Sequence, residues 1–499
     1  MPFDLHARLT SFETGEPPES EGGIYQDTWR QLLPVSVTTT IFVCACNRCL
    51  RAILGQRCIT NPGAKTMDQY QVTRRQLLGS LAATMTMPAL GWAASAATPK
   101  TRHIVVTYAW SYSNIGDIGI TPGLLTLLNR YIPEARVTIV SNARDDAQAT
   151  ENHRAFLGRY FPDATVIGTP FRGGDGKAFD EAMATADLLL YNSGTTLSHG
   201  RWNSEWNKTL PYWMPLLVAR DMGVPYGVYC QSFETFTGLS ERLIVPLLSQ
   251  ADFCFARDGD SLKFLRELGV KNKHLEFGPD ATFGYDSRDD RWAEQFMREY
   301  NLEPRKFITL TIRSSIQGFI DEKREAVHAA KLRELTTTWV RKTGLPVLVC
   351  PEVKHELEPA RKLIYDPLPD DVKKQVRLKE TFWDPDQAFS VYAQARCIVS
   401  MEMHSVIMSI AAGTPTLHPR FAEAGRKAWM LRDLGVEKWL SDLDADPAEK
   451  SIAALMDIHN DFDGALGDVG SAKAIVARRQ AETMAIVKQA VERGARRAR

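Results

Sequence analysis

The sequence predicts an α/β fold with two Rossmann-like domains that face each other across a cleft. Short apolar runs alternate with helix-like segments in the first part of the chain, at 103–109, 136–141, 164–168, 187–191, 226–230, 252–256 and 274–277. Continuous apolar strands separated by helices are typical of a parallel sheet covered on both faces. The alternation stops in the charged and aromatic stretch 285–306 and restarts at 307–312, which predicts a second, smaller domain.

The second domain repeats the pattern of the first with fewer strands. Strand-like runs at 307–312, 346–350 and 397–399 are separated by predicted helices at 321–342 and 386–395. Asn301-Leu302-Glu303-Pro304 has the composition of a connector. We therefore expect an N-terminal domain over 103–300, a C-terminal domain over 305–445 and C-terminal helices over 446–499.

The segment 67–97 resembles a twin-arginine export signal. An Arg74-Arg75 pair precedes the small and apolar stretch 81–92, and Ala94-Ser95-Ala96 offers a cleavage site. Such signals begin near a start methionine, and Met67 lies seven residues before Arg74. We therefore expect residues 1–66 to be a non-native or disordered extension, and the mature protein to be periplasmic or exported. The alternative location is the cytoplasmic face of the inner membrane.

Composition excludes several classes of partner. The chain has 60 basic and 60 acidic side chains, so no net charge favours nucleic acid. No apolar stretch of the mature chain is long enough to span a bilayer. The N-terminal cysteines Cys44, Cys46, Cys49 and Cys58 lack the paired spacing of a zinc site, and we expect no metal.

A polar turn follows the first predicted strand and leads into a helix. It reads Ser113-Asn114-Ile115-Gly116-Asp117. Asn114 and Asp117 can satisfy free backbone donors at the helix start, and Gly116 lets the backbone approach a bound anion closely. Open α/β sheets bind ligands at this edge, so the turn is a candidate binding loop; a capped turn without ligand is the alternative.

Three later segments place further polar residues at strand ends. The strand at 252–256 runs into Arg257-Asp258, and the segment HLEFGPDATF carries Asp280. The segment RCIVSMEMHSVIMSIAAGTP combines a buried strand, a polar elbow with Glu402 and His404, and a helix of small residues.

These four segments, in this order, resemble the polysaccharide pyruvyl transferase family. The shared motifs are the N-x-G-D turn, R-D-x-x-S-x-x-x-L-x-x-L-G-V, P-D-A-T-F, and S-x-x-x-H followed by a helix and G-T-P. The family commonly has arginine where this chain has Glu402, and a glycine triplet where this chain keeps only Gly194. The resemblance implies a bilobal architecture similar to that of GT-B glycosyltransferases.

The resemblance also implies an activity. The chain would add a pyruvate ketal from phosphoenolpyruvate, its donor substrate, to a sugar of a bacterial surface polysaccharide or of its lipid-linked precursor, without a cofactor. One alternative is a GT-B-like glycosyltransferase that uses an activated sugar. Another is a non-catalytic glycan-binding protein with the same fold, which the missing arginine would allow. Phosphoenolpyruvate is a cytoplasmic metabolite, so this donor and the export signal indicate different compartments.

Pyruvyl transfer requires a site for two anionic groups of the donor. Arginine suits carboxylate and phosphate because its planar fork matches their oxygens. Arg257 and Arg313 each follow a predicted strand, one in each domain, so both are candidates. Asp258 and Asp280 are further candidates for substrate binding. The structural alternatives are an ion pair of Arg257 with either aspartate and a surface position for Arg313.

The reaction also requires a proton donor and a base. His404 coincides with the motif histidine of the family and is the first candidate; a helix cap or a buried structural histidine is the alternative. Asp117 matches the N-x-G-D acid and could position an acceptor hydroxyl or act as a base. Glu402 could orient His404, act as acid or base itself, or bind Arg257.

An aromatic region provides a possible platform for the acceptor sugar. It contains Tyr191, Trp202, Trp206, Tyr212 and Trp213, with Asn192 and His199 beside them. Sugar rings stack on aromatic side chains, although packing in a hydrophobic core explains the same residues.

Overall fold

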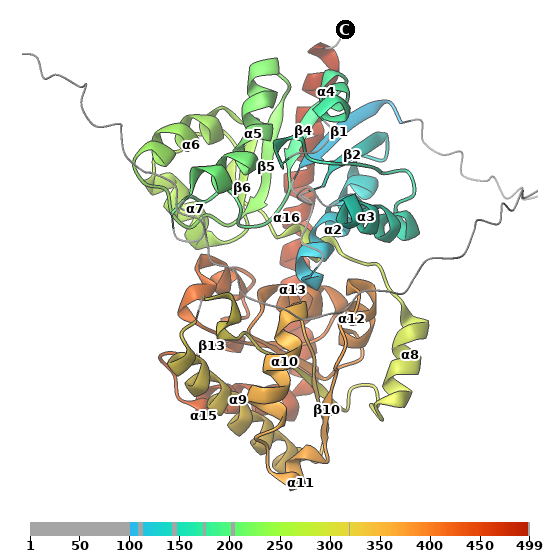
Figure 1. Ribbon diagram of the computed structural model, residues 1–499, viewed down its shortest axis with the longest axis vertical. Coiled ribbons are helices and arrows are strands. Elements are labelled where there is room, and N and C mark those ends of the chain that lie inside the picture. The colour runs from blue at the N-terminus through green and yellow to red at the C-terminus, as the bar shows by residue number, and fades with distance from the viewer. Residues whose placement is uncertain are drawn as a thin grey trace, which may run out of the picture. The chain divides into compact units, whose positions relative to one another are not determined.

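The computed structural model describes residues 100–107, 113–141, 147–172, 176–200, 205–318 and 320–497. The predicted extension 1–66 and the predicted export signal 67–97 lie outside these residues, as does Trp202. Residues 94–499 form one compact unit. Within it the described residues form two separate sheets with helices packed around them (Figure 1).

The first sheet has seven strands, all parallel, in the order β3-β2-β1-β4-β5-β6-β7. Each strand lies within two residues of a strand that the apolar pattern predicts. The strands are β1 (Arg102–Thr107), β2 (Ala135–Val140), β3 (Thr165–Ile167), β4 (Leu188–Tyr191), β5 (Tyr226–Gln231), β6 (Phe253–Ala256) and β7 (Leu275–Phe277).

Helices connect these strands and cover the sheet. They are α2 (Ile115–Tyr131), α3 (Ala147–Tyr160), α4 (Gly176–Ala184), α5 (Trp206–Met222), α6 (Leu239–Gln250) and α7 (Gly259–Glu267), with short 3₁₀ turns η1 (Pro170–Arg172) and η2 (Ala281–Gly284). The charged and aromatic stretch 285–306, where the predicted alternation of strands and helices stops, contains one further helix, α8 (Asp290–Glu299).

The second sheet has six parallel strands in the order β10-β9-β8-β11-β12-β13. The sequence predicts β8 (Ile308–Thr311), β9 (Val347–Val349) and β11 (Cys397–Ser400). The remaining strands are β10 (Val376–Leu378), β12 (Thr416–Arg420) and β13 (Leu440–Asp442). These are short or carry polar residues and a proline, so they lack the apolar run on which the prediction depends.

The second sheet has its own set of helices. They are α9 (Glu322–Thr343), α10 (Leu357–Pro359), α11 (Asp370–Lys373), α12 (Pro385–Tyr392), α13 (Met403–Ala412), α14 (Met430–Asp433), α15 (Ala448–Asn460) and α16 (Phe462–Arg497). Single turns lie between them at η3 (Ser315–Gln317), η4 (Lys354–Glu356), η5 (Ala360–Tyr365), η6 (Ala422–Ala424), η7 (Arg426–Trp429) and η8 (Glu437–Trp439).

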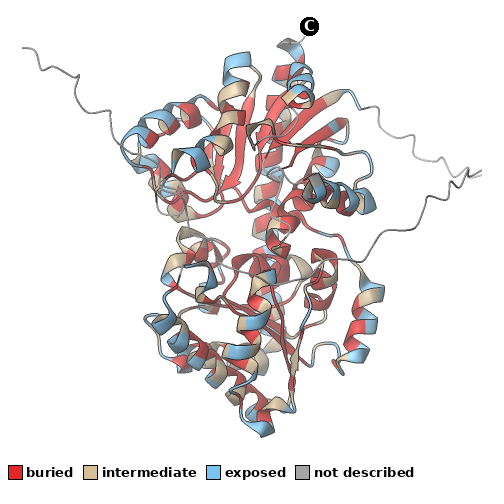
Figure 2. Cartoon of the chain, in the orientation of Figure 1, coloured by how far each residue is buried: buried red, intermediate tan, exposed pale blue. Residues whose placement is uncertain are grey.

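Helix α16 connects the two lobes. Val469 and Val476 in its first half join the core around the second sheet, while Met484 and Val487 in its second half join the core of the first sheet. Figure 2 shows buried residues concentrated in both sheets and on the inner faces of the helices. The α/β fold with two Rossmann-like parallel sheets is therefore confirmed.

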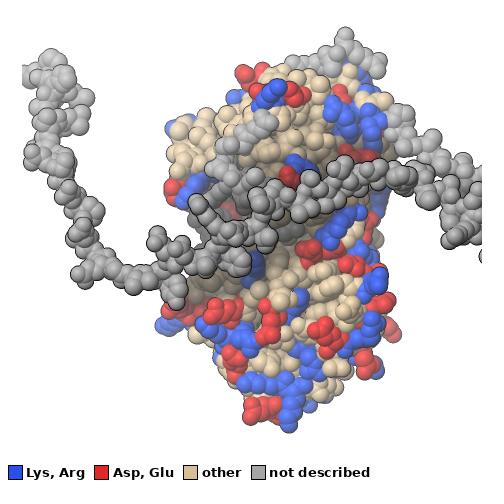
Figure 3. All heavy atoms as spheres, turned by 45° about the vertical axis from the view of Figure 1, so that its right-hand side comes forward, with Lys and Arg blue, Asp and Glu red and all other residues tan. Residues whose placement is uncertain are grey.

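The face of the molecule seen in Figure 3 carries side chains of both charges. In Figure 3, acidic and basic side chains alternate over the face in view. None of the helices that the structure describes is both long enough and apolar enough to cross a membrane.

Candidate functional site

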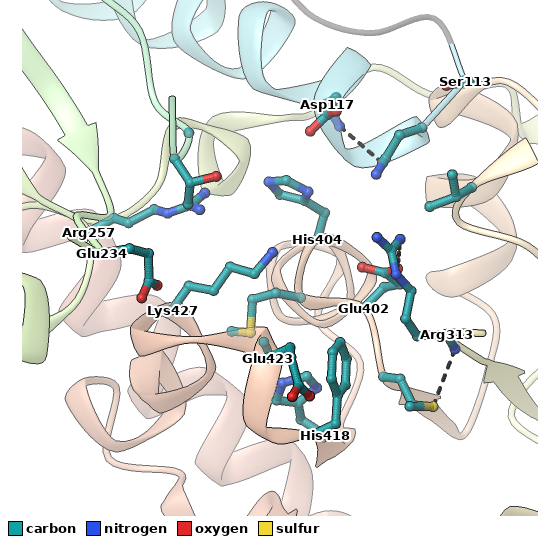
Figure 4. A pocket seen from close by; sticks show the side chains of 18 residues that line it. Ser113, Asp117, Glu234, Arg257, Arg313, Glu402, His404, His418, Glu423 and Lys427 are labelled. Atoms are coloured by element: carbon teal, nitrogen blue, oxygen red, sulfur yellow. Dashed lines mark hydrogen bonds and ion pairs between the residues drawn. The ribbon is translucent and has the colours of Figure 1, made fainter. Parts of the chain in front are cut away.

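A pocket of about 300 Å³ lies between the carboxyl ends of the two sheets. Both lobes contribute charged side chains that point into it (Figure 4). The described residues that line it are Ser113, Asn114, Asp117, Gly194, Thr195, Glu234, Arg257, Arg313, Val353, Met401, Glu402, Met403, His404, His418, Phe421, Glu423, Ala424 and Lys427.

The topology of the sheets explains why these loops meet. The strand order reverses between β1 and β4 in one sheet and between β8 and β11 in the other. Connections leave the two strands at such a switch point in opposite directions, which opens a crevice at their carboxyl ends. The pocket combines both crevices, because Asn114 follows β1, Gly194 follows β4, Arg313 follows β8 and Glu402 follows β11.

The α2 end of the pocket is held by backbone hydrogen bonds between the lobes. Asn114 and Val353 form an antiparallel bridge. The backbone N–H of Ile115 donates to the carbonyl of Glu352 at 3.0 Å, and that of Lys354 donates to the carbonyl of Ser113 at 2.7 Å. The binding-loop candidate after β1 is therefore fixed to the opposite lobe.

Asn114 and Asp117 form the first turn of α2. The Oδ1 of Asn114 accepts from the backbone N–H of Gly116 at 2.8 Å and of Asp117 at 3.2 Å, as an N-cap. The Asp117 carboxylate itself faces the pocket (Figure 4). Burial raises its pKa, against the opposing effect of His404 and Lys427. A carboxylate with a raised pKa is a stronger base than one in water.

His404 lies in the first turn of α13, and its ring packs against Gly116 of the other lobe. A Cβ at position 116 would come within 2.1 Å of the His404 Cβ. The glycine therefore makes room for this histidine, whereas the sequence interpretation assigned that space to a bound anion. The Nε2 of His404 is buried and has no hydrogen-bond partner among the residues that the structure describes. This atom is available to a ligand.

Glu352 faces the other ring nitrogen of His404. Its Oε1 is 3.7 Å from the His404 Nδ1. Its Oε2 accepts from both the backbone N–H and the hydroxyl of Ser405 at 2.6 Å. The carboxylate is thus anchored beside the imidazole. The sequence interpretation did not select Glu352, although it follows β9 directly, in the same position as the other site residues.

Arg257 enters the pocket from the end of β6. Its Nη1 pairs with Asp280 at 2.5 Å, and its Nε donates to the Ser232 hydroxyl at 2.8 Å. Burial opposes ionisation of Asp280, but Arg257 and His404 hold its pKa below the usual value. Within the described residues the Nη2 of Arg257 has no hydrogen bond. One edge of the guanidinium is thus left for a ligand.

Asp258 and Asp280 lie behind the pocket wall. Both side chains are fully buried, and neither belongs to the lining. Asp258 caps α7 by accepting from the Ser261 backbone N–H at 2.6 Å, and it also accepts from the Ser232 hydroxyl. These aspartates hold Arg257 in place; neither faces the cavity, as direct substrate binding would require.

Arg313 is paired with two carboxylates. Its Nη1 is 2.6 Å from Glu402, and its Nε is 4.0 Å from Glu356. Against the effect of burial, Arg313 and Lys427 lower the pKa of Glu402. Burial raises the pKa of Glu356 to about 7. Glu402 therefore pairs with the arginine of its own lobe, and Arg257 pairs with Asp280 instead.

Of the residues selected from the sequence, six line the pocket and three do not. The lining residues are Asn114, Asp117, Arg257, Arg313, Glu402 and His404, and the others are Gly116, Asp258 and Asp280. None of the aromatic side chains that the structure describes in that region lines the pocket. Two further lining residues were missed. Lys427 follows β12, a strand that the apolar pattern does not predict, and Glu234 follows the predicted strand β5 but carries no motif that marks it as a site residue. Among the described residues no three His, Cys, Asp or Glu side chains are arranged for a metal ion.

Comparison with known proteins gives one sequence match and several weak structural ones. The family model described as polysaccharide pyruvyl transferase matches residues 114–418, which include every lining residue but Ser113, Phe421, Glu423, Ala424 and Lys427. No curated protein matches the chain.

Solved structures with a similar arrangement include S. aureus MnaA with UDP (14% identity, TM-score 0.46, 74% of this chain and 91% of that chain). Anabaena Alr3699/HepE with UDP-glucose gives 11% identity, a TM-score of 0.48 and coverage of 78% and 98%. The E. coli ADP-heptose lps heptosyltransferase II gives 12%, 0.42, and coverage of 72% and 99%.

Proposed function

The chain belongs to the polysaccharide pyruvyl transferase family, and we propose that it transfers the pyruvyl group of phosphoenolpyruvate to two hydroxyl groups of a sugar, forming a ketal. The family indicates a transferase that acts in polysaccharide biosynthesis. The observation that carries the finer proposal is the pocket, where the open Nε2 of His404 faces a cavity shared with the Asp117 carboxylate and the Arg257 guanidinium.

The donor has a carboxylate and a phosphate, and both need cationic partners. Arg257 is held by Ser232 and Asp280 with one edge toward the cavity, so it can bind an anion without reorganisation. Because this guanidinium is fixed before the donor arrives, binding costs little conformational entropy.

The first chemical step adds a sugar hydroxyl across the donor double bond. The hydroxyl oxygen bonds to C2, the π electrons of the double bond take a proton at C3 to give a methyl group, and the hydroxyl proton passes to a base. We assign proton donation at C3 to His404 and proton removal to Asp117. Both side chains face the same cavity, and Asp117 has a raised pKa that suits a base.

The second step closes the ketal. The bond between C2 and the phosphate oxygen breaks, and inorganic phosphate leaves with the bonding electrons. The second sugar hydroxyl bonds to C2 and releases its proton, which ends on the phosphate. Transfer of the proton from Asp117 to His404 returns both residues to their starting states, and the net reaction consumes one phosphoenolpyruvate and one sugar diol and yields one ketal and one phosphate.

Glu352 is assigned a positioning role in this scheme. Two hydrogen bonds from Ser405 fix its carboxylate next to the Nδ1 of His404. A carboxylate in that position favours a proton on Nδ1, which orients the ring and leaves Nε2 as the nitrogen that exchanges a proton with the substrate. Glu352 therefore supports proton transfer at Nε2 without facing the cavity itself.

We further propose that the acceptor is a sugar of a bacterial surface polysaccharide or of its precursor. The carboxylates of Glu234 and Glu423 and the ring of Phe421 line the remaining wall and suit sugar hydroxyls and a sugar face. Export through the twin-arginine pathway stays a proposal from residues 73–96, with the cytoplasmic face of the inner membrane as the alternative.

The proposal is tested with the purified chain, phosphoenolpyruvate and mixed bacterial glycans. We expect release of phosphate that depends on the glycan, together with a new ketal methyl signal in the glycan NMR spectrum. UDP-glucose in place of phosphoenolpyruvate is the matched alternative donor. Sugar transfer from UDP-glucose, or no phosphate release with any acceptor, would contradict the assigned reaction.

A further inference from the structure

We propose that Lys427 is the second anion-binding residue of the donor site, and that its ammonium group contacts the carboxylate or phosphate of the donor alongside Arg257. This inference rests on the proposed function for the identity of the donor. Lys427 lies in η7, beyond the segment that the family model matches.

The charge balance of the pocket distinguishes Lys427 from the two arginines. Arg257 is paired with Asp280, and Arg313 with Glu402 and Glu356. Lys427 lines the same cavity, yet no carboxylate of the described residues lies within 4.0 Å of its Nζ and no hydrogen bond satisfies it. It is the one lysine or arginine of the described lining whose charge has no such partner.

The side chain of Lys427 extends into the cavity. In Figure 4 its ammonium end lies between Arg257 and Glu402 and below the His404 ring. Burial lowers its pKa, Glu402 opposes that effect, and Arg257 adds to it. A cation held beside another cation in a partly desolvated site is stabilised strongly by an arriving anion.

The backbone around Lys427 is fixed to the opposite lobe. The neighbouring Arg426 donates from its backbone N–H to the Glu234 Oε1 at 3.0 Å and from its Nη1 to the Phe233 carbonyl at 2.8 Å. Its guanidinium also lies 4.2 Å from the centre of the Phe264 ring. The Arg426 side chain thus binds the first lobe while Lys427 points into the cavity.

Gly425 permits this close approach. Its φ is 73°, and a Cβ there would come within 2.2 Å of the Glu234 carboxylate. Contact between the lobes at Glu234 therefore brings η7 to the pocket, and Lys427 with it. The loop that carries Lys427, the second cation of the site, therefore contacts the opposite lobe at Glu234.

The same charges indicate that Arg313 holds Glu402 in place and does not bind the donor. A guanidinium that donates to the Glu402 carboxylate and lies 4.0 Å from Glu356 has less positive charge to offer a ligand. Arg313 and Lys427 together lower the pKa of Glu402, so Glu402 stays ionised between them. Lys427, at the end of a flexible stem, can turn toward an anion where Arg313 stays fixed.

The test is calorimetric titration of phosphoenolpyruvate into the wild-type chain and into Lys427→Met. We expect the Kd to rise by about 10- to 100-fold, because the variant loses a charge-assisted hydrogen bond in a partly buried site. Lys427→Arg should restore part of the affinity. Lys438→Met is the matched control, since Lys438 is exposed in the same lobe and pairs with Asp468 at 2.6 Å. Its Kd should be unchanged.

Each result decides the inference. Equal Kd values for wild type and Lys427→Met would overturn it and leave the proposed reaction intact. If the wild type binds UDP-glucose and no phosphoenolpyruvate, the proposed reaction fails; the inference then stands only if Lys427→Met weakens UDP-glucose binding. A wild type that binds neither ligand would overturn both. If Lys427→Met does not fold, Lys427→Gln replaces it in every comparison.

Discussion

The sequence analysis names two histidine-containing regions as candidate sites, and the structure gives the two histidines different hydrogen-bond environments. His199 lies in the aromatic region that precedes α5, and His404 lies at the start of α13; each is 7% exposed. The Nδ1 of His199 is 2.7 Å from the Thr209 hydroxyl, and its ring stacks on Trp206 at 4.3 Å. The Nε2 of His404 has no hydrogen-bond partner in the described part of the chain and faces a charged cavity.

The comparison shows that burial alone does not identify a functional histidine. Trp213, beside His199, is 1% exposed and donates its Nε1 proton to the Leu197 carbonyl at 3.0 Å. Buried polar groups in a folded core normally have their hydrogen bonds made. An unsatisfied ring nitrogen that faces a cavity is therefore the signal of a site, and a satisfied one is the signal of packing.

The largest expected effect is on catalysis at His404. His404→Ala should lower turnover by about 10²- to 10⁴-fold, since it removes the proposed proton donor. The melting temperature should stay close to that of the wild type. Turnover is measured as phosphate release from phosphoenolpyruvate with a glycan acceptor. A stable variant with unchanged turnover would remove His404 from the mechanism and favour the glycan-binding alternative.

The second prediction concerns the aromatic region. Trp213→Ala should lower the free energy of unfolding by about 3–5 kcal/mol, because it leaves a large cavity and an unpaired Leu197 carbonyl. Turnover per folded molecule should not change, because Trp213 is absent from the pocket lining. Urea unfolding and turnover of the folded fraction are the two measurements. A selective loss of glycan affinity would instead support the acceptor platform.

The fold could be predicted from the sequence because buried parallel strands are continuous apolar runs separated by helix-like segments. The strands of the first sheet are continuous apolar runs, whereas β12, which contains His418 and Pro419, and the short β13 do not form such runs. Site residues that follow predicted strands, such as Asp117 and Arg257, could be selected. Lys427 and Glu352 could not be assigned roles, because their proximity to His404 depends on how separate loops of the second lobe fold together.

Sequence reasoning also could not distinguish a ligand contact from an internal ion pair. Asp280 and Arg257 lie 23 positions apart and Glu402 and Arg313 lie 89 apart. Each residue alone has the character of a site residue. Only the three-dimensional structure shows that these charges balance each other and that, among the described residues, the ammonium group of Lys427 has no such pair.

A third, smaller effect is expected at Glu352. Glu352→Gln keeps the size of the side chain and removes the charge beside the His404 Nδ1. Turnover should fall by about 10- to 100-fold, the range expected for the loss of one charge-assisted interaction. The KM for phosphoenolpyruvate should change little, because Glu352 does not line the cavity. A variant with raised KM and unchanged turnover would show that Glu352 acts in binding rather than in positioning His404.

The smallest predicted effect concerns stability at Glu356, next to Arg313. Burial raises the pKa of this carboxyl from 4.5 to about 7 in the folded protein. Between these values the folded state binds a proton that the unfolded state has released, so stability falls as pH rises from 4.5 toward 7. The shift corresponds to at most about 3 kcal/mol. Glu356→Gln cannot ionise and should lack this loss.

The measurement is urea unfolding of wild type and Glu356→Gln across the same pH series. The stability of Glu356→Gln relative to wild type should increase from about pH 4.5 to 7 and level off above it. Glu358→Gln is the control, because Glu358 is an exposed residue of α10 that pairs with Lys362. Parallel curves for wild type and Glu356→Gln would mean that Arg313 compensates the charge fully. A stability difference that grows with pH would show that the ionised Glu356, beside the pocket residue Arg313, destabilises the fold. The buried region around His199 has no such charge in this comparison.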